Sequence, residues 1–254
     1  MTHLGEHPKK ILRWSLGLSP LFVFLVGWQL LGNSSSPFFP PPSTWFDVLS
    51  ARGWDEFLTI LWATTRVFTV GLAVAVLAGI GLGLVFGRSA VINTLVSPTL
   101  EFLRAIPAPA VVPLVILFVG PGTTTLVLSV AFAALWPILL NATESARTIE
   151  PVLIDSGRTL RLSRFDHVWK IVIPAVLPGA FVGIRVALPI ALVVTLLAEM
   201  LTGTSGLGGA LMEAQRSYQT ASAYGLLVIA GLLGLGISLV FGLLEHLSFR
   251  AWDA

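Results

Sequence analysis

The sequence contains no cysteine, only four histidines and few charged side chains. Without cysteine, disulfide bonds, thiolate metal sites and thiol catalysis are excluded. The histidines are scattered along the chain, so a metal cluster is not expected either; they are His3, His7, His167 and His246. The acidic residues form no pair at a spacing that general acid–base catalysis would use. We therefore expect a chain that is not an enzyme and that binds no metal or cofactor itself.

The charge that is present does not indicate a nucleic-acid partner. The formal net charge is +2 and the isoelectric point is near 9.4, but the lysines and arginines lie between apolar runs instead of forming one face. Hydrophobic residues make up 55% of the 254 residues, charged residues 11%, and the mean hydropathy is +0.89. Such a composition is typical of a membrane protein. Because a span needs roughly 20 apolar residues, this length holds several spans and no large soluble domain.

Residues 1–56 are predicted to form a cytoplasmic tail, a first transmembrane helix and an external loop. The apolar run from Trp14 to about Leu31 follows three basic residues, an arrangement shared by signal peptides and retained anchors. We favour an anchor, because the run is long for a signal peptide and carries a tryptophan near each end. The proline-rich stretch from Asn33 to Pro42 is then an external loop at the membrane interface.

Two of the following spans have distinctive small or rigid residues. The run from Leu61 to Phe86 and the residue after it carry glycines at four-residue spacing, which predicts close packing of another helix on that face. The run from Ile92 to Val119 contains four prolines, which predicts a broken helix. A broken helix at membrane depth can line a solute path, and it can also be a kinked packing helix. Both interpretations remain open at this point.

Apolar runs over residues 124–141, 171–201 and 221–244 complete a six-span prediction, with the polar interval 143–170 cytoplasmic and the loop 202–220 outside. By this arrangement basic residues gather on the cytoplasmic side, as the positive-inside rule requires. Those inside are Lys9, Lys10, Arg13, Arg88, Arg147, Arg158, Arg161, Arg164, Lys170 and Arg250, and those outside are Arg52, Arg66 and Arg216. Both termini are then cytoplasmic, with a transmembrane domain at 57–248 and a C-terminal tail at 249–254.

Part of the cytoplasmic interval matches the spacing of a known motif. Asp155-Ser156-Gly157, then Arg161, then Ile171-Val172-Ile173-Pro174 resemble the EAA loop of binding-protein-dependent ABC permeases, which has the pattern E-A-A, three residues, G, nine residues, I-x-L-P. Only Ile171 and Pro174 match it literally. Further segments resemble the nitrate, sulfonate, taurine and bicarbonate branch of type I permeases; they are Leu103–Pro107, Pro178–Ala180, Gly183–Arg185, Ala198–Leu201 and Ser205–Gly208.

The resemblance implies an all-α integral membrane protein with six transmembrane helices, the type I ABC importer permease fold. It also implies a small, anionic solute delivered by an external solute-binding protein, and a second permease copy or a paralogous permease. ATP and magnesium would bind to partner ATPase subunits seated on the coupling loop, about residues 147–173. The membrane would be a bacterial-type plasma membrane. The alternatives are a permease for another small solute, such as an aromatic acid, a vitamin precursor or a phosphonate, and an ion-coupled secondary carrier.

The resemblance further assigns an ATPase-coupling role to one group of residues: Asp155, Ser156, Gly157, Arg161, Leu162, Ile171, Ile173 and Pro174. Ser163 is expected to cap a second short helix in this loop. Arg161 stands where the motif has glycine, which allows a turn at little steric cost. Either the loop is weakened and couples less strongly to its motor, or the change is harmless.

Four residues are candidates for the translocation path: Arg104, Pro107, Arg185 and Glu199. Arg104 precedes the proline-rich break, where it could attract an anion or lie at the cytoplasmic edge. Arg185 lies eleven residues past Pro174, near mid-span, and is expected to pair with Glu101 or Glu199. Glu199 could also be solvated at the outer end of its span. The glycine-rich run at 206–209 lacks the ending of a phosphate loop and is not expected to bind phosphate.

Overall fold

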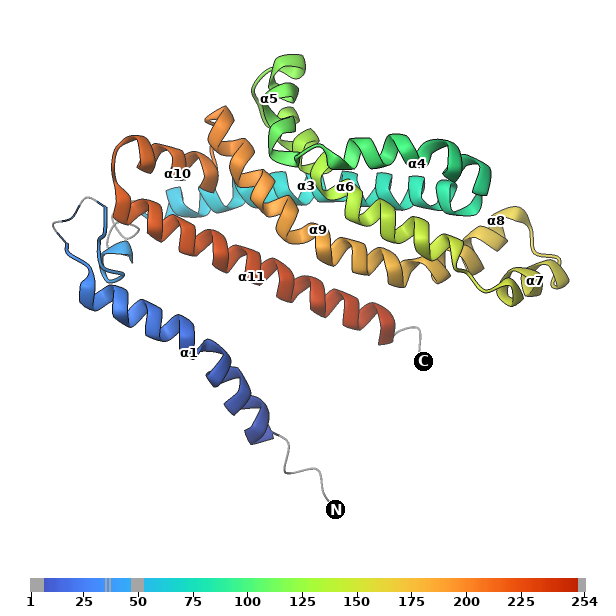
Figure 1. Cartoon of the computed structure of the whole chain (residues 1–254), viewed down its shortest axis with the longest axis horizontal. Coiled ribbons are helices and arrows are strands. Elements are labelled where there is room, and N and C mark those ends of the chain that lie inside the picture. Colours follow the sequence, from blue (N-terminus) through green and yellow to red (C-terminus); the bar gives the residue numbers. More distant parts are fainter. Residues whose placement is uncertain (1–6, 35, 37, 47–52, 251–254) are drawn as a thin grey trace.

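The computed structural model is an elongated helical bundle, with α3, α6, α9 and α11 running along its length and α1 set apart (Figure 1). It describes residues 7–34, 36, 38–46 and 53–250, and these contain no strand. The all-α prediction is therefore confirmed for this part of the chain. Arg52 and most of the two predicted terminal tails lie outside the described residues.

Four helices are long and apolar enough to cross a membrane. They are α3 (Trp54–Arg88), α6 (Thr123–Arg147), α9 (Ile173–Thr202) with the short helices that precede it, and α11 (Thr220–Arg250). A fifth span is possible if α4 (Ala90–Ala105) and α5 (Ala108–Val119) are counted together. Helix α1 (His7–Leu31) has only a shorter apolar part over Ser19–Leu31 among the described residues. The described residues therefore form several membrane spans, but they reach four or five and not the six that the sequence predicted.

The predicted break in the third span is present. Helices α4 and α5 meet at 93°, with Ile106 and Pro107 between them. Proline lacks the backbone N–H that a continuous helix would need, and its ring disfavours a helical residue before it. The chain therefore turns sharply within the apolar run.

Glycines allow α3 to approach α6 closely. A Cβ atom on Gly79 would lie 2.8 Å from the Ile138 side chain, and one on Gly83 would lie 2.6 Å from the Ala142 Cβ. Such distances are shorter than van der Waals contact, so only glycine fits without a shift of the helices. The packing role predicted for these glycines is thus confirmed.

The main core lies where α6 packs between α3 and α9. Val130, Ala134 and Ile138 of α6 are fully buried, and Ala187 and Ala191 are their counterparts on α9. The small side chains let the helices pack closely, as is common between membrane helices. This core fixes α9, which joins the two ends of the bundle.

A cluster of aromatic rings fixes the end of α1 to the start of α11. Trp28 stacks on Phe39 with ring centroids 4.8 Å apart and meets Trp45 and Tyr224 edge-on, both at 5.1 Å. The indole nitrogens of both tryptophans donate hydrogen bonds to the Pro40 carbonyl, at 3.1 and 3.3 Å. The proline-rich loop after α1 is therefore folded back on the bundle.

Short helices occupy opposite ends of the molecule (Figure 1). At one end, α7 (Pro151–Thr159) and α8 (Arg164–His167) are followed by a π-helical turn, η1 (Val168–Val172), that continues into α9. At the other end, α10 (Leu207–Arg216) lies between α9 and α11. We call these the α7 end and the α10 end.

Candidate functional site

The motif residues lie together at the α7 end. Helix α7 begins with proline, whose fixed φ suits the first helical position, and it contains Asp155, Ser156 and Gly157. One face of α7 borders a shallow cavity of about 490 Å³; its lining is Val152, Asp155, Ser156, Thr159 and Leu160. The spacing of these residues is that of a single helix face. Leu160 is 71% exposed, so the cavity has an uncovered apolar edge.

Gly157 lies on the opposite, packed side of α7. A Cβ atom there would lie 2.6 Å from Nδ1 of His167 and 2.5 Å from Cδ1 of Ile171. The glycine therefore lets α7 rest directly on α8 and η1. This contact brings together the two halves of the motif, which the sequence separates by 14 positions.

Arg161 has the left-handed backbone conformation that glycine normally supplies. Its φ is +49°, and the Leu162 N–H donates to the Gly157 carbonyl at 3.1 Å. This bond is the one that closes a Schellman turn after a helix, with Arg161 in the position where glycine is preferred. The turn expected from a glycine is thus present, but a side chain is held in a conformation that costs about 1–2 kcal/mol.

Ser163 caps α8 as predicted. Its hydroxyl accepts a hydrogen bond from the Asp166 N–H at 3.1 Å and donates one to the Asp166 carboxylate at 2.6 Å. Asp166 also pairs with Lys170 at 2.7 Å. Polar contacts therefore order the loop between α7 and α9 on its exposed side.

The inner side of this loop is fixed by an apolar cluster. Val172 and Val176 are buried against Ala142, Ala146 and Ile149 at the end of α6. The remaining motif residues, Ile171, Ile173 and Pro174, are partly buried in η1 and the first turn of α9. The chain is helical without interruption from Arg164 to Thr202, so the loop passes directly into α9.

Arg185 forms an ion pair with Glu245 of α11, not with Glu101 or Glu199 as predicted. The Arg185 side chain is 64% exposed and that of Glu245 is 16% exposed. Glu245 follows the uncharged run of α11 directly, so the pair lies toward the α7 end of the spans and not at mid-span. The predicted partners were wrong. The folded chain places Glu245 of α11 beside Arg185, although the two residues are 60 positions apart in the sequence.

Glu199 is fully buried, which contradicts the solvated position considered for it. Its carboxylate accepts hydrogen bonds from the Thr64 hydroxyl at 3.0 Å and the Gly208 N–H at 2.8 Å. Thr64 in turn accepts from the Leu207 N–H at 2.8 Å. Glu199 and Thr64 thereby cap α10 from two neighbouring helices. Within the described residues, the other carboxylate oxygen of Glu199 is buried with no partner.

Sequence reasoning missed Thr64 and the function of the glycine-rich run. A Cβ atom on Gly208 would lie 2.1 Å from the Leu196 carbonyl, so this glycine permits α10 to lie against α9. The glycine spacing was the available signal for a close approach, whereas Thr64, 135 residues from Glu199, gave none.

The other two path candidates lie at the break between α4 and α5. Arg104 is in the last turn of α4 and Pro107 precedes the first residue of α5. Helix α4 has no buried residue, so Arg104 and Glu101 are exposed on this chain. The break and the arginine next to it are therefore open to a partner, lipid or solvent.

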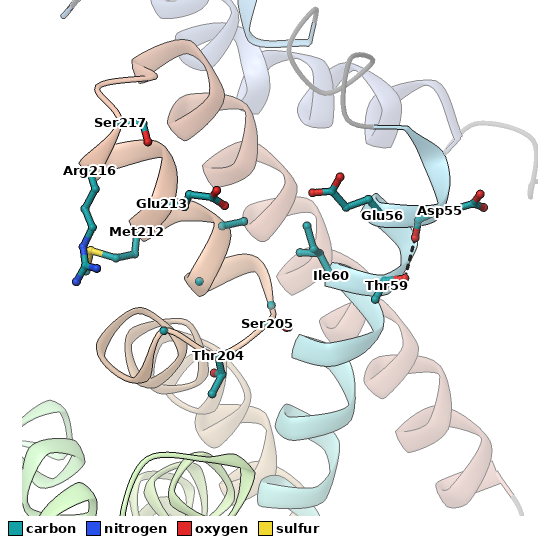
Figure 2. Close-up of a pocket in the computed structure, with 14 residues that line it drawn as sticks. Asp55, Glu56, Thr59, Ile60, Thr204, Ser205, Met212, Glu213, Arg216 and Ser217 are labelled. Carbon is teal, nitrogen blue, oxygen red and sulfur yellow. Dashed lines mark hydrogen bonds between the residues drawn. The ribbon is translucent and has the colours of Figure 1, made fainter.

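A larger cavity of about 860 Å³ lies at the α10 end, between the start of α3 and α10 (Figure 2). Glu56 and Glu213 point toward one another across it (Figure 2), and Arg216 is also one of its lining residues. The Thr59 hydroxyl donates to the Asp55 carbonyl at 2.8 Å on the α3 side. The cavity is thus an exposed hollow in which acidic side chains predominate, and α10, the helix that Glu199 caps, forms one of its walls.

Comparison with known proteins confirms the resemblance to binding-protein-dependent permeases. Residues 75–252 match the family model described as "Binding-protein-dependent transport system inner membrane component". The chain is 27% identical over 251 residues to the nitrate import permease protein NrtB of Leptolyngbya laminosa, covering 95% of this chain and 90% of the relative. It is 29% identical over 237 residues to the taurine transport system permease protein TauC of Escherichia coli strain K12, covering 88% and 86%.

A solved structure shares the fold. The inward-facing MetNI methionine ABC transporter aligns with a TM-score of 0.63 and 17% identity, over 75% of this chain and 95% of that one. At this identity the match supports the helical arrangement alone.

Proposed function

The chain belongs to the family of binding-protein-dependent transport system inner membrane components, and from this premise we propose that it passes a small oxyanion. As a member of this family it is a multi-pass membrane protein and a transport component, not an enzyme. Relatives named for nitrate, bicarbonate, taurine and aliphatic sulfonates support a solute that carries an oxyanion group.

The surface of α7 is the observation that carries the proposal of an ATP-driven importer. It has an open cavity with an exposed apolar edge at Leu160, and Gly157 seats it on the helix turn that continues into α9. A soluble motor bound there could push on α9 without an intervening flexible joint. We assign this surface to an ATPase subunit, which would bind ATP and magnesium itself.

The α7 end is assigned to the cytoplasm and the α10 end to the outside. The basic residues at the α7 end include Arg88, Arg147, Arg164 and Lys170, which favours a cytoplasmic position. Both termini would then be cytoplasmic, in a bacterial-type plasma membrane. The external binding protein would deliver the solute at the α10 end. The transmembrane domain would cover residues 57–248, and a second permease, identical or paralogous, would complete the path.

Arg104, Pro107 and Arg185 remain our candidates for the path. Arg104 and Arg185 are exposed on this chain, and a charged side chain in a span is costly unless it faces protein or water. The break at Pro107 leaves backbone groups that need polar partners. Glu199 is removed from this group, because its hydrogen bonds assign it to the capping of α10.

Reconstitution tests this function. The chain is placed in vesicles with the ATPase, the second permease if there is one and the binding protein encoded near its gene, and uptake of nitrate, bicarbonate, taurine and methanesulfonate is measured. All four carry an oxyanion group, and we expect ATP-dependent uptake of at least one of them and none without the ATPase. Uptake that persists without the ATPase would identify a secondary carrier. ATP-dependent uptake only of solutes without an oxyanion group would overturn the proposed substrate class.

A further inference from the structure

The ion pair between Arg185 and Glu245 lies at the edge of the hydrocarbon layer. The 20 residues from Gly225 to Leu244 contain no charged side chain, and a helix of that length spans about 30 Å. Glu245 begins the next turn, so Arg185 beside it is near the boundary at the α7 end. By the proposed orientation this is the cytoplasmic mouth of the spans.

The pair leaves much of the Arg185 guanidinium unused. A guanidinium has five N–H donors, and one carboxylate accepts at most two of them in a bidentate pair. The Arg185 side chain is 64% exposed, whereas Glu245 is largely covered by its neighbours. The aromatic rings of Phe181 and Phe241, each four residues before one of the two partners, pack against each other at 5.7 Å. Because the Arg185 side chain is exposed, its remaining donors are available to a second anion.

A backbone acceptor is also open at the same turn of α9. Pro189 has no N–H, so the Arg185 carbonyl lacks its usual partner four residues ahead. Val182, Val186 and Val193 lie on the same uncovered face as Arg185, and each is about half exposed. An unused carbonyl and unused N–H groups on one face need water or polar ligands, because lipid tails satisfy neither. This face of α9 is thus suited to a hydrated path.

We propose that Arg185 is a transient binding position for the oxyanion at the cytoplasmic mouth, with Glu245 as its permanent counter-ion; this inference rests on the proposed function. Conduction requires sites that bind strongly enough to admit a solute and weakly enough to release it. An arginine without a counter-ion would bind the anion too tightly. The carboxylate of Glu245 weakens this binding because it offsets the positive charge of Arg185. Because Arg185 is much more exposed than Glu245, the guanidinium stays accessible to the solute while the carboxylate stays covered.

Three variants test this assignment in the reconstituted system, with the same four anions as probes. In R185Q/E245Q both charges are absent and two amides can still hydrogen-bond, so we expect normal assembly and uptake reduced by about tenfold or more. R185E/E245R keeps the ion pair but moves the cation to the covered position on α11, and uptake should fall similarly. E245Q should lower both the apparent KM and the maximal rate, because the anion is released more slowly.

The matched control is R250Q. It removes an exposed arginine from the last turn of α11, the helix that carries Glu245, and should leave uptake unchanged. Uptake like wild type in R185Q/E245Q or in R185E/E245R would overturn the inference and leave only a structural ion pair. Loss of assembly in both variants would overturn it too. If wild type itself takes up none of the anions, the proposed function fails instead.

A lipid phosphate offers the same oxyanion chemistry as the solute, so the assay is run in two kinds of vesicle. One contains phosphatidylcholine alone and the other also contains phosphatidylglycerol. A solute position predicts the same loss of uptake for R185Q/E245Q in both. A loss confined to vesicles with phosphatidylglycerol would assign Arg185 to an anionic lipid and would contradict the proposal.

Discussion

Replacing Arg161 with glycine should stabilise the turn between α7 and α8. The residue has φ +49°, a conformation that costs a non-glycine residue about 1–2 kcal/mol. Glycine removes this strain, but its greater freedom in the unfolded chain costs about 0.5–1 kcal/mol. The net gain is therefore about 0.5–1 kcal/mol for the local structure. It corresponds to a roughly two- to fivefold change in the opening equilibrium.

Hydrogen exchange of the Leu162 amide measures this change, because its N–H bonds the Gly157 carbonyl across the turn. We expect exchange in R161G to be slower by roughly two- to fivefold. The matched control is R161A, which removes the charge and retains the strained backbone, so exchange should stay close to wild type. Equal slowing in both variants would refute the strain argument and would assign the effect to the charge.

The same variant tests whether the loop limits coupling to the motor. If strain at Arg161 weakens transmission from the ATPase, R161G should raise transport-coupled ATP hydrolysis while R161A does not. An unchanged rate, together with slower exchange, would show that the strained turn is stable enough for its task. The hypothesis of impaired coupling would then be wrong, and the arginine would be a harmless replacement.

Three further predictions concern packing, capping and docking. Gly83→Val should lower the stability of the detergent-solubilised protein by about 1–3 kcal/mol because it forces α3 from Ala142; an unchanged melting temperature would contradict the close packing. Glu199→Ala should cost about 1–3 kcal/mol by leaving the Gly208 N–H unpaired, whereas Glu199→Gln keeps an acceptor and should melt near wild type; equal melting of both variants would exclude the capping role. Leu160→Asp should reduce co-purification of the ATPase with little change in monomer stability, and full retention of the ATPase would argue against the α7 surface as its seat.

Local patterns predicted the parts of this fold that depend on neighbouring residues. The proline run predicted the break at Pro107, and Ser163 predicted a helix cap, because both effects act within a turn or two of the chain. The glycine spacing predicted the face on which α3 packs. The coupling role that the EAA spacing assigns to this loop stays a prediction, and the structure adds that Arg161 takes the conformation of the absent glycine.

Contacts between distant segments were not predictable in the same way. Arg185 finds Glu245 and Glu199 finds Thr64 because separate spans bring these residues to the same level. Any acidic residue at the same depth in the membrane could have paired with Arg185, so the sequence alone did not single out one partner. In the part of the chain that the structure describes, the apolar stretch of α1 is Ser19–Leu31, which is shorter than the roughly 20 apolar residues of a full span.

The absence of a flexible joint between η1 and α9 gives the protein a mechanical lever. Helix α9 has 30 residues and is therefore about 45 Å long. A tilt of about 10° imposed on its α7 end would displace its other end by roughly 8 Å. Glu199 lies three residues before that far end and holds the start of α10, so the swing would carry α10 with it. If an ATPase docks at the α7 end as proposed, a small stroke there would be enlarged across the thickness of the membrane into a movement of the size of a small ion's passage.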